Sequence, residues 1–395
     1  MTELDGMRGI ACGVVVLLHT IFGIIPFASD SAGGAIQTAL QPFMVGGVDL
    51  FFVLSGFLIG GILIDNKGAS NFFRAFWTRR IARIFPVYFL LFFSFVGILA
   101  VRPYIDAPWL DIWLLKEQLA LWTYATFTQN FAMALASSGG PRWIGITWSL
   151  AVEEQFYLLL PPLVYLLARR SLVGLAVCGI VAAPIIRSLL WTEQSWFASY
   201  VLLPGRMDTL MFGVLATCIV RSPLALDIAR RMRTKLDVIA AILAASVAFG
   251  IFDLIAEHIQ HRQLELFVRT LRYSALAAFY GIAVLRIFLV AEGPYRRILR
   301  NPLLVHIGLI SYAFYMYHQA VNGLAHGYFF GQAPRISSLA EFLLALSVLA
   351  VAYTLSRISM TFMERPIRRR GQQVKYRRPA APQPVAPPAP APERI

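Results

Sequence analysis

The sequence predicts an all-α integral membrane protein, built as a bundle of about ten transmembrane helices. Of its 395 residues, 58% are hydrophobic and only 14% are charged, whereas soluble domains are about half apolar and about a quarter charged. Apolar runs of about 20 residues, enough to cross a hydrocarbon core of ~30 Å, recur along the chain. The 35 Lys and Arg residues gather between these runs, which indicates membrane topology rather than nucleic-acid binding.

Ten apolar segments account for the expected helices. Their approximate cores are residues 9–28, 48–64, 84–101, 149–168, 172–191, 207–220, 238–256, 272–291, 304–326 and 339–362. The sixth is short, and we expect the aromatic segment 109–135 to be a re-entrant or interfacial piece. Basic residues are dense in alternate loops, so both termini are expected on the cytoplasmic side. An even number of spans agrees with this placement.

The chain divides into a transmembrane domain, residues 1–370, and residues 371–395, which are basic and rich in Pro and Ala. That composition predicts a disordered cytoplasmic tail. Cys12, Cys178 and Cys218 all lie in apolar runs, without the spacing of a zinc site or a disulfide framework. We therefore expect three core cysteines and no bound metal.

The first span carries an unusual pair of ionisable residues, Arg8 and His19. Eleven residues at ~100° each make about three turns, so both side chains share one helix face, about 16 Å apart along the axis. An ionisable group deep in a membrane is costly and by default marks a functional site. A histidine is also suited to take a proton from a hydroxyl near neutral pH. The alternative is a single interhelical hydrogen bond from the ring.

Seven stretches together point to a family. In chain order they are "LDGMRG", "GVDLFFVLSGFLI", "RRIARIFPVYF", "TWSLAVEEQFYLLLP", "GRMDTLMFG", "ISYAFYMYHQAV" and "ERPIRR". The first stretch contains Arg8, and His19 follows that arginine by eleven residues. This ordered set, spread over about residues 3–370, resembles the membrane-bound acyltransferase 3 family. The resemblance implies transfer of an acyl group from cytoplasmic acyl-CoA to sugars or other hydroxyl compounds, in a bacterial cytoplasmic membrane.

Glu153 and Glu154 lie inside the fourth span. Counted back from the basic residues at its cytoplasmic end, they lie about 23 Å above that end, somewhat beyond the height of His19 above Arg8, so the two sites could meet. Adjacent helical residues point about 100° apart, so one of the two can face the interior squarely. By position and resemblance we expect Glu153 to orient His19 or hold its positive charge. The alternative is an ion pair with an intramembrane arginine, Arg187 or Arg286.

Arg80 and Arg83 share one face at the cytoplasmic end of the third span. With Arg8, they are expected to bind the phosphates of coenzyme A, since guanidinium groups grip phosphate through two parallel hydrogen bonds. The alternative is ordinary positive-inside anchoring and contact with lipid headgroups.

Further polar or aromatic residues of the motifs are expected to contact substrate. They are Asp49, Ser55, Trp148, Glu154, Arg206, Asp208 and His318. Two of these expectations have structural alternatives: Ser55 as an interhelical hydrogen-bond donor, and Arg206 with Asp208 as an ion pair. A serine nucleophile is a further alternative for Ser55, but no strand–turn–helix context surrounds this residue, so the hydrogen-bond role is favoured.

Together these features predict a membrane O-acyltransferase that acts on a cell-surface or lipid-linked saccharide or a related small acceptor. The expected partners are acyl-CoA, that acceptor and the lipid bilayer, without nucleic acid. His19 would deprotonate the acceptor hydroxyl or carry the acyl group itself, and both routes stay open. The alternative function is a proton-coupled transporter or flippase for a saccharide or lipid-linked precursor, with His19, Glu153 and His318 as a proton relay.

Overall fold

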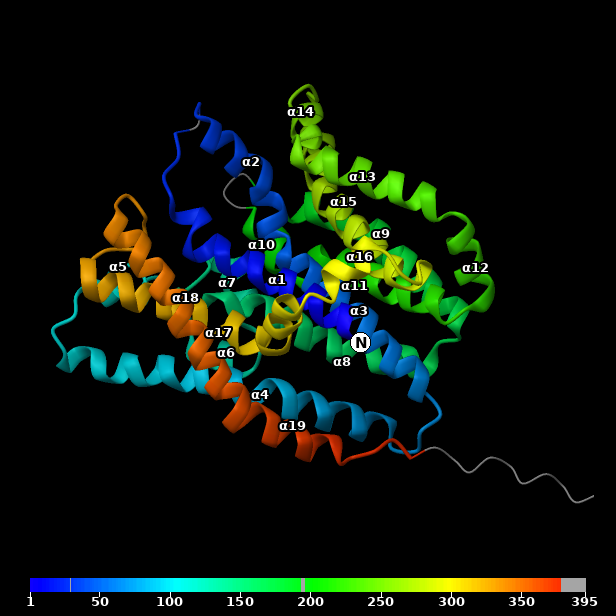
Figure 1. The fold of residues 1–395 in the computed structure, drawn as a ribbon, viewed down its shortest axis with the longest axis horizontal. Coiled ribbons are helices and arrows are strands. Elements are labelled where there is room, and N and C mark those ends of the chain that lie inside the picture. The colour runs from blue at the N-terminus through cyan, green and yellow to red at the C-terminus, as the bar shows by residue number, and fades with distance from the viewer. Residues whose placement is uncertain (29, 193–195, 378–395) are drawn as a thin grey trace, which may run out of the picture.

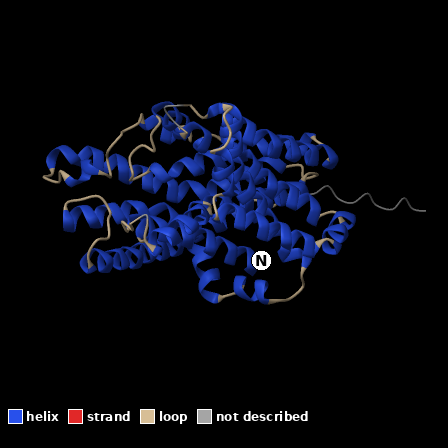
Figure 2. Ribbon diagram, turned by 90° about the horizontal axis from the view of Figure 1, so that it is seen from above, coloured by secondary structure: helices blue, strands red, loops and turns tan. Residues whose placement is uncertain are grey.

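The computed structural model describes residues 1–28, 30–192 and 196–377 of the 395-residue chain. Within these residues all regular structure is helical, and Figure 2 shows the helices and the loops that join them. The prediction of an all-α protein is confirmed over this part of the chain.

A helix lies in each of the ten segments expected to span the membrane. These helices are α1 (Thr2–Thr20), α3 (Gly47–Asn66), α4 (Phe72–Val101), α8 (Trp148–Leu166), α9 (Arg169–Leu190), α11 (Leu203–Val220), α13 (Arg233–Ala248), α15 (Arg262–Leu289), α17 (Pro302–Phe330) and α18 (Leu339–Ser359). The other α-helices of the described residues are α2 (Ala32–Val45), α5 (Trp109–Ile112), α6 (Leu121–Ala125), α7 (Gln129–Ala136), α10 (Phe197–Val201), α12 (Pro223–Arg231), α14 (Ile251–Ala256), α16 (Pro294–Leu299) and α19 (Arg365–Gln372).

Seven helical stretches within the described residues are long and apolar enough to cross a membrane, judged by length and composition. These stretches support a protein that crosses the membrane several times, but the expected number of about ten is not confirmed. Of the other expected spans, α13 has 16 residues. Helices α8 and α17 are also not among the seven stretches.

Helix α1 lies near the middle of the molecule and packs against α3 and α17 (Figure 1). Glycines allow the close approach of α1 and α17. A Cβ atom at Gly9 would overlap the backbone carbonyl of Leu304, and one at Gly308 would overlap that of Asp5. Small residues let helix backbones come this near in a membrane. The two helices are therefore held at a fixed separation by backbone contact.

The first helix differs from the span expected over residues 9–28. It begins at Thr2 and ends at Thr20, and the chain continues in a short 3-10 turn, Phe22–Ile24. His19 consequently lies in the last turn of α1 rather than in the middle of the helix. The segment between α4 and α8 forms the short helices α5, α6 and α7 with two 3-10 turns, Arg102–Tyr104 and Gly145–Thr147.

Part of the expected tail packs on the bundle. The Arg377 amide donates to Asn71 Oδ1 at 2.8 Å, and Arg79 Nε donates to the Val374 carbonyl at 3.0 Å. Residues 373–377 thus lie along the start of α4. The remainder of the predicted tail, residues 378–395, lies outside the described residues.

Candidate active site

Residues from α1, α3, α4, α8 and α17 enclose a cavity of about 300 Å³ at the end of the bundle predicted to face the cytoplasm. We call it the arginine cavity because Arg8, Arg80 and Arg83 line it. Arg80 and Arg83 are three residues apart in α4 and share one face of that helix. The structure therefore brings together the three arginines that were predicted to act together.

The arginine cavity carries an excess of positive charge. Arg8 pairs with Asp5 at 3.3 Å, whereas Arg80 and Arg83 form no ion pair within residues 1–28, 30–192 and 196–377. Glu153 adds one carboxylate to the lining. A site with three guanidinium groups and one lining carboxylate would attract an anion such as a phosphate group.

The two glutamates of α8 take different positions. Glu153 lines the arginine cavity together with Ser55 and Tyr157, whose hydroxyl oxygens are 2.6 Å apart. Glu154 is not part of that lining, and its Oε1 is buried without a hydrogen-bond partner among the described residues. Ser55 bonds across to another helix, which agrees with its structural alternative.

A second cavity, of about 190 Å³, contains the His19 side chain in its wall. We call it the histidine chamber. Trp148 and Gln319 line it as well, and so does Arg142, an exposed residue of the loop before α8. Trp148 therefore faces the same space as His19, as its predicted contact with substrate requires.

His19 is hydrogen bonded to His318, with 2.8 Å between His19 Nδ1 and His318 Nε2. On the other side of the His318 ring, Nδ1 lies 2.6 Å from the Tyr315 carbonyl oxygen. A carbonyl oxygen can only accept, so His318 Nδ1 carries the hydrogen. In a pair of neutral rings His318 Nε2 then accepts, and His19 Nδ1 donates. This arrangement leaves a lone pair on His19 Nε2, an atom that has no hydrogen-bond partner in the part of the chain that the structure describes.

The end of α1 fixes the His19 backbone too. Carbonyl groups in the last turn of a helix have no partner further along that helix. Asn322 Nδ2 donates to the His19 carbonyl oxygen at 2.9 Å. Both His318 and Asn322 belong to α17, and both are fully buried. Helix α17 thus holds both the ring and the backbone of His19.

The predicted contact between Glu153 and His19 is not what the structure shows. Val48 and Tyr315 line both cavities, so these two side chains form the partition between the arginine cavity and the histidine chamber. Glu153 lies on the arginine side, and His19 is hydrogen bonded to His318 instead. The reason is the backbone contact between α1 and α17, which gives the place beside His19 to a residue of α17.

Tyr315 is anchored within the partition by its hydroxyl group. Its oxygen lies 2.9 Å from Ser149 Oγ and donates to the Ile146 carbonyl at 3.2 Å. Ser149 lines the arginine cavity, while Ile146 lines the histidine chamber. Two hydroxyl groups therefore lie at the boundary between the two spaces.

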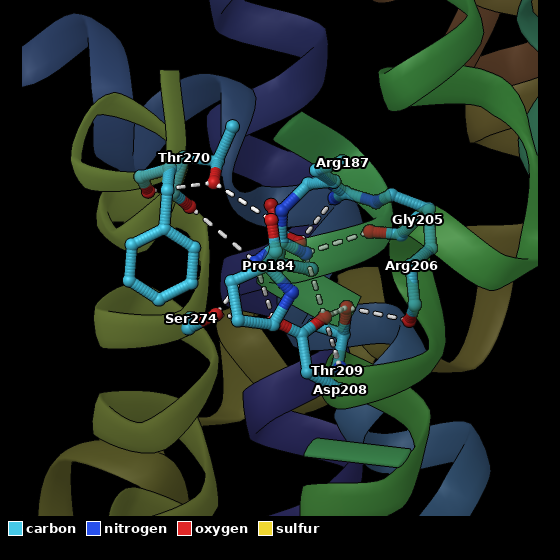
Figure 3. Close-up of polar contacts among 10 residues, drawn as sticks. Pro184, Arg187, Gly205, Arg206, Asp208, Thr209, Thr270 and Ser274 are labelled. Atoms are coloured by element: carbon cyan, nitrogen blue, oxygen red, sulfur yellow. Dashed lines mark hydrogen bonds and ion pairs between the residues drawn. The ribbon is translucent and has the colours of Figure 1, made fainter. Parts of the chain in front are cut away.

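Asp208 is part of a buried structural network (Figure 3). Arg187 donates to both of its carboxylate oxygens, at 3.0 and 2.9 Å, and to the Gly205 carbonyl at 2.6 Å. Ser274 Oγ donates to the same carboxylate at 2.6 Å. Both charged side chains are 1% exposed. Asp208 is thus enclosed by protein groups, and Arg187 pairs with it rather than with Glu153.

Arg206 forms an ion pair with Asp49, and not with Asp208 as in the structural alternative to substrate contact. Residues two apart in a helix point about 200° from each other, so Arg206 and Asp208 face opposite sides of α11. Arg206 is completely buried, and its Nε and Nη1 atoms have no hydrogen-bond partner among the described residues.

The structure adds three residues to the site that the sequence did not single out as site residues. Tyr315 forms the partition, and Gln319 and Arg142 line the histidine chamber. Gln319 Oε1 is buried without a hydrogen-bond partner in the described part of the chain. A sequence signal existed for two of them, since Tyr315 and Gln319 belong to the motif that contains His318.

Comparison with known proteins gives an independent line of evidence. A family model described as an acyltransferase domain matches residues 1–357. The chain is 26% identical over 395 residues to the O-acetyltransferase OatA of Staphylococcus aureus strains NCTC 8325 and COL, covering 93% of this chain and 57% of each relative. The chain therefore spans less than two thirds of these relatives' length. No solved structure matches it. The match to the family model over most of the chain shows that this protein belongs to the acyltransferase 3 family.

Proposed function

We propose that this protein is a membrane O-acyltransferase that moves an acetyl group from cytoplasmic acetyl-CoA to a hydroxyl of a saccharide or a related small acceptor. The observation that carries the proposal is the free Nε2 lone pair of His19, in a chamber that adjoins an arginine-lined cavity. The matching relatives are named O-acetyltransferases, which supports acetyl as the transferred group.

The donor enters the arginine cavity in this proposal. Arg8, Arg80 and Arg83 hold the phosphate groups of coenzyme A at the cytoplasmic end. The thioester then reaches the partition formed by Val48 and Tyr315. Guanidinium groups are suited to this task because each can offer two parallel N–H donors to a phosphate.

The acceptor hydroxyl enters the histidine chamber. His19 Nε2 takes the hydroxyl proton while the oxygen attacks the thioester carbonyl carbon. As the attack proceeds, the Tyr315 hydroxyl turns from the Ile146 carbonyl and donates its hydrogen to the thioester carbonyl oxygen, on which negative charge develops. The carbon–sulfur bond then breaks, the thiolate takes the proton from His19 Nε2, and the products are the ester and free coenzyme A.

His318 supports this reaction without touching the substrate. It holds the hydrogen of His19 on Nδ1, and it accepts that hydrogen bond when His19 becomes positively charged. The free Nε2 atom also suits a covalent route, in which Nε2 attacks the thioester and the hydroxyl then takes the acyl group from the ring. The function is the same in both routes.

The transporter alternative requires His19, Glu153 and His318 to act as one proton relay. In the described residues, no hydrogen bond links the histidine pair to Glu153, which lies beyond the partition. The three side chains therefore do not form the relay that a transporter would need, and the acyltransferase is the single candidate function.

The test uses the purified full-length protein in detergent with labelled acetyl-CoA and a panel of glycans. Transfer of label to a glycan, or slow hydrolysis of acetyl-CoA without acceptor, is expected for the natural chain and is lost in His19→Ala. His258→Ala is the matched control, because that ring is exposed and its one hydrogen bond among the described residues is to the nearby Leu254 carbonyl. Undiminished transfer by His19→Ala would overturn the proposal.

A further inference from the structure

A larger cavity lies among α2, α10, α13 and α15, at the end of the bundle predicted to face away from the cytoplasm. Its volume is about 910 Å³, compared with about 190 Å³ for the histidine chamber. We call it the outer cavity. The reaction proposed above makes no use of it.

The outer cavity adjoins the histidine chamber, because Val45 and Tyr200 line both. The Tyr200 ring lies 4.8 Å from that of Trp148, which faces the histidine chamber. In the outer cavity its neighbours are Trp196 at 5.4 Å and Tyr273 at 6.1 Å, measured between ring centroids. Four aromatic rings thus connect the histidine chamber with the outer cavity.

The polar groups of the outer cavity are balanced in charge. Asp49 pairs with the buried Arg206 behind it, and Asp253 pairs with Arg272 at 3.1 Å. The neutral polar residues of the lining are Thr38, Gln41 and Ser246. Because each lining carboxylate has its own guanidinium partner, the outer cavity lacks the excess positive charge of the arginine cavity. This balance favours a neutral ligand over a phosphorylated one.

We propose that the outer cavity binds an oligosaccharide acceptor of two or more sugar rings and that one hydroxyl extends past Tyr200 into the histidine chamber. This inference rests on the proposed function. Sugar rings have apolar C–H faces that pack against aromatic rings, and hydroxyl groups that bond to amide, carboxylate and guanidinium groups. In the histidine chamber, Gln319 Oε1 accepts a hydrogen bond from the sugar next to the reacting hydroxyl.

The test is a comparison of acceptors with the full chain and its Trp196→Ala variant. Trp196 is 45% exposed and lines the outer cavity beyond Tyr200. The variant is expected to raise the KM for a tetrasaccharide by about tenfold, as for loss of an aromatic anchor at a binding site. Its KM for glycerol, which fits within the histidine chamber, is expected to change less than twofold.

Trp122→Ala is the matched control, since Trp122 is 66% exposed and lies in α6, away from the outer cavity. An equal rise in KM in this control, or an unchanged tetrasaccharide KM in Trp196→Ala, would overturn the inference. Either result leaves the proposed function in place as long as the natural chain transfers acetyl groups. If the natural chain transfers acetyl to neither acceptor, the proposed function fails first, and this inference fails with it.

A labelling experiment gives a second measurement that does not depend on turnover. Thr38→Cys places a thiol at an exposed position of the outer cavity, in a background with Cys178→Ser because Cys178 is exposed. We expect the tetrasaccharide to slow labelling by a membrane-impermeant maleimide at least threefold. Equal labelling rates with and without the tetrasaccharide would contradict occupation of the outer cavity.

Discussion

His19 Nδ1 and His318 Nε2 lie 2.8 Å apart, although 299 residues separate them in the chain. The Tyr315 carbonyl on the far side of His318 gives this contact a direction, because it requires a hydrogen on His318 Nδ1. The two rings and the carbonyl form a chain of hydrogen bonds that leaves the outermost atom, His19 Nε2, free to accept a proton.

The first prediction concerns His318. His318→Leu removes the acceptor for His19 Nδ1–H and lets the ring turn or change its tautomer, so kcat should fall by about 100-fold or more. The KM for acetyl-CoA should stay within about twofold, because His318 does not line the arginine cavity. Steady-state kinetics with varied acetyl-CoA measures both values.

His318→Gln is the matched variant, because an amide oxygen can still accept a hydrogen bond from His19. It should retain at least about ten times the kcat of His318→Leu. Equal loss in both variants would argue that His318 acts through bulk packing rather than through the hydrogen bond.

The second prediction concerns the arginine cavity. Arg83→Ala should raise the KM for acetyl-CoA by about tenfold, the size expected for losing one charge-assisted contact to phosphate. The KM for acetyl-pantetheine, which has no phosphate group, should not respond. Arg170→Ala is the control, since Arg170 is exposed and belongs to another basic cluster. A rise in KM for both donors would show that Arg83 shapes the cavity instead of binding phosphate.

The third prediction concerns the buried pair of Arg187 and Asp208. Asp208→Ala leaves a guanidinium buried without its carboxylate, which should lower the free energy of unfolding by about 3–5 kcal/mol. Thermal unfolding of the protein in detergent should show a lower midpoint temperature. The double variant Arg187→Met with Asp208→Leu removes both charges and should recover part of the loss. A single variant as stable as the natural chain would contradict this structural role.

The fourth prediction concerns the contact between α1 and α17. Gly308→Ala places a methyl group against the Asp5 carbonyl and should separate the helices, with a loss of about 1–3 kcal/mol in stability. Activity should fall as well, because His19 and His318 belong to the two separated helices. Gly174→Ala is the matched control, since a Cβ atom there meets no atom within 4 Å. If the two variants were equally stable, backbone contact at Gly308 would not be what fixes the distance between α1 and α17.

Local patterns in the sequence predicted a helix in every expected segment and the gathering of Arg8, Arg80 and Arg83. The helices and the shared face of Arg80 and Arg83 follow from hydropathy and from the helical repeat, which act over a few residues. The grouping with Arg8 rested on the cytoplasmic position of all three arginines and on the family resemblance. The sequence predicted Glu153 beside His19, whereas the hydrogen-bond partner of that ring in the structure is His318. Height in the membrane does not say which helix is the neighbour. That choice depends on how α1 and α17 pack, and the glycines that decide it are 299 residues apart, as at Gly9 and Gly308.

The ion pairs show the same limit. Arg206 and Asp208 are close in sequence, yet each pairs with a residue from another helix, Asp49 and Arg187. Helical geometry excludes an ion pair between Arg206 and Asp208, but it does not predict which residues of other helices pair with them. The position of Tyr315 between two cavities could not be predicted from local sequence patterns either, because it depends on how five helices pack together.

The partition of Val48 and Tyr315 has a consequence for the cell. In the proposed reaction, donor and acceptor come from opposite faces, and two carbon atoms and one oxygen are the only heavy atoms that pass between them. Coenzyme A would then stay inside and the sugar outside, and no continuous water path would be needed. Such an enzyme could acetylate molecules on the outer face of the membrane without letting ions leak down the gradients that the same membrane maintains.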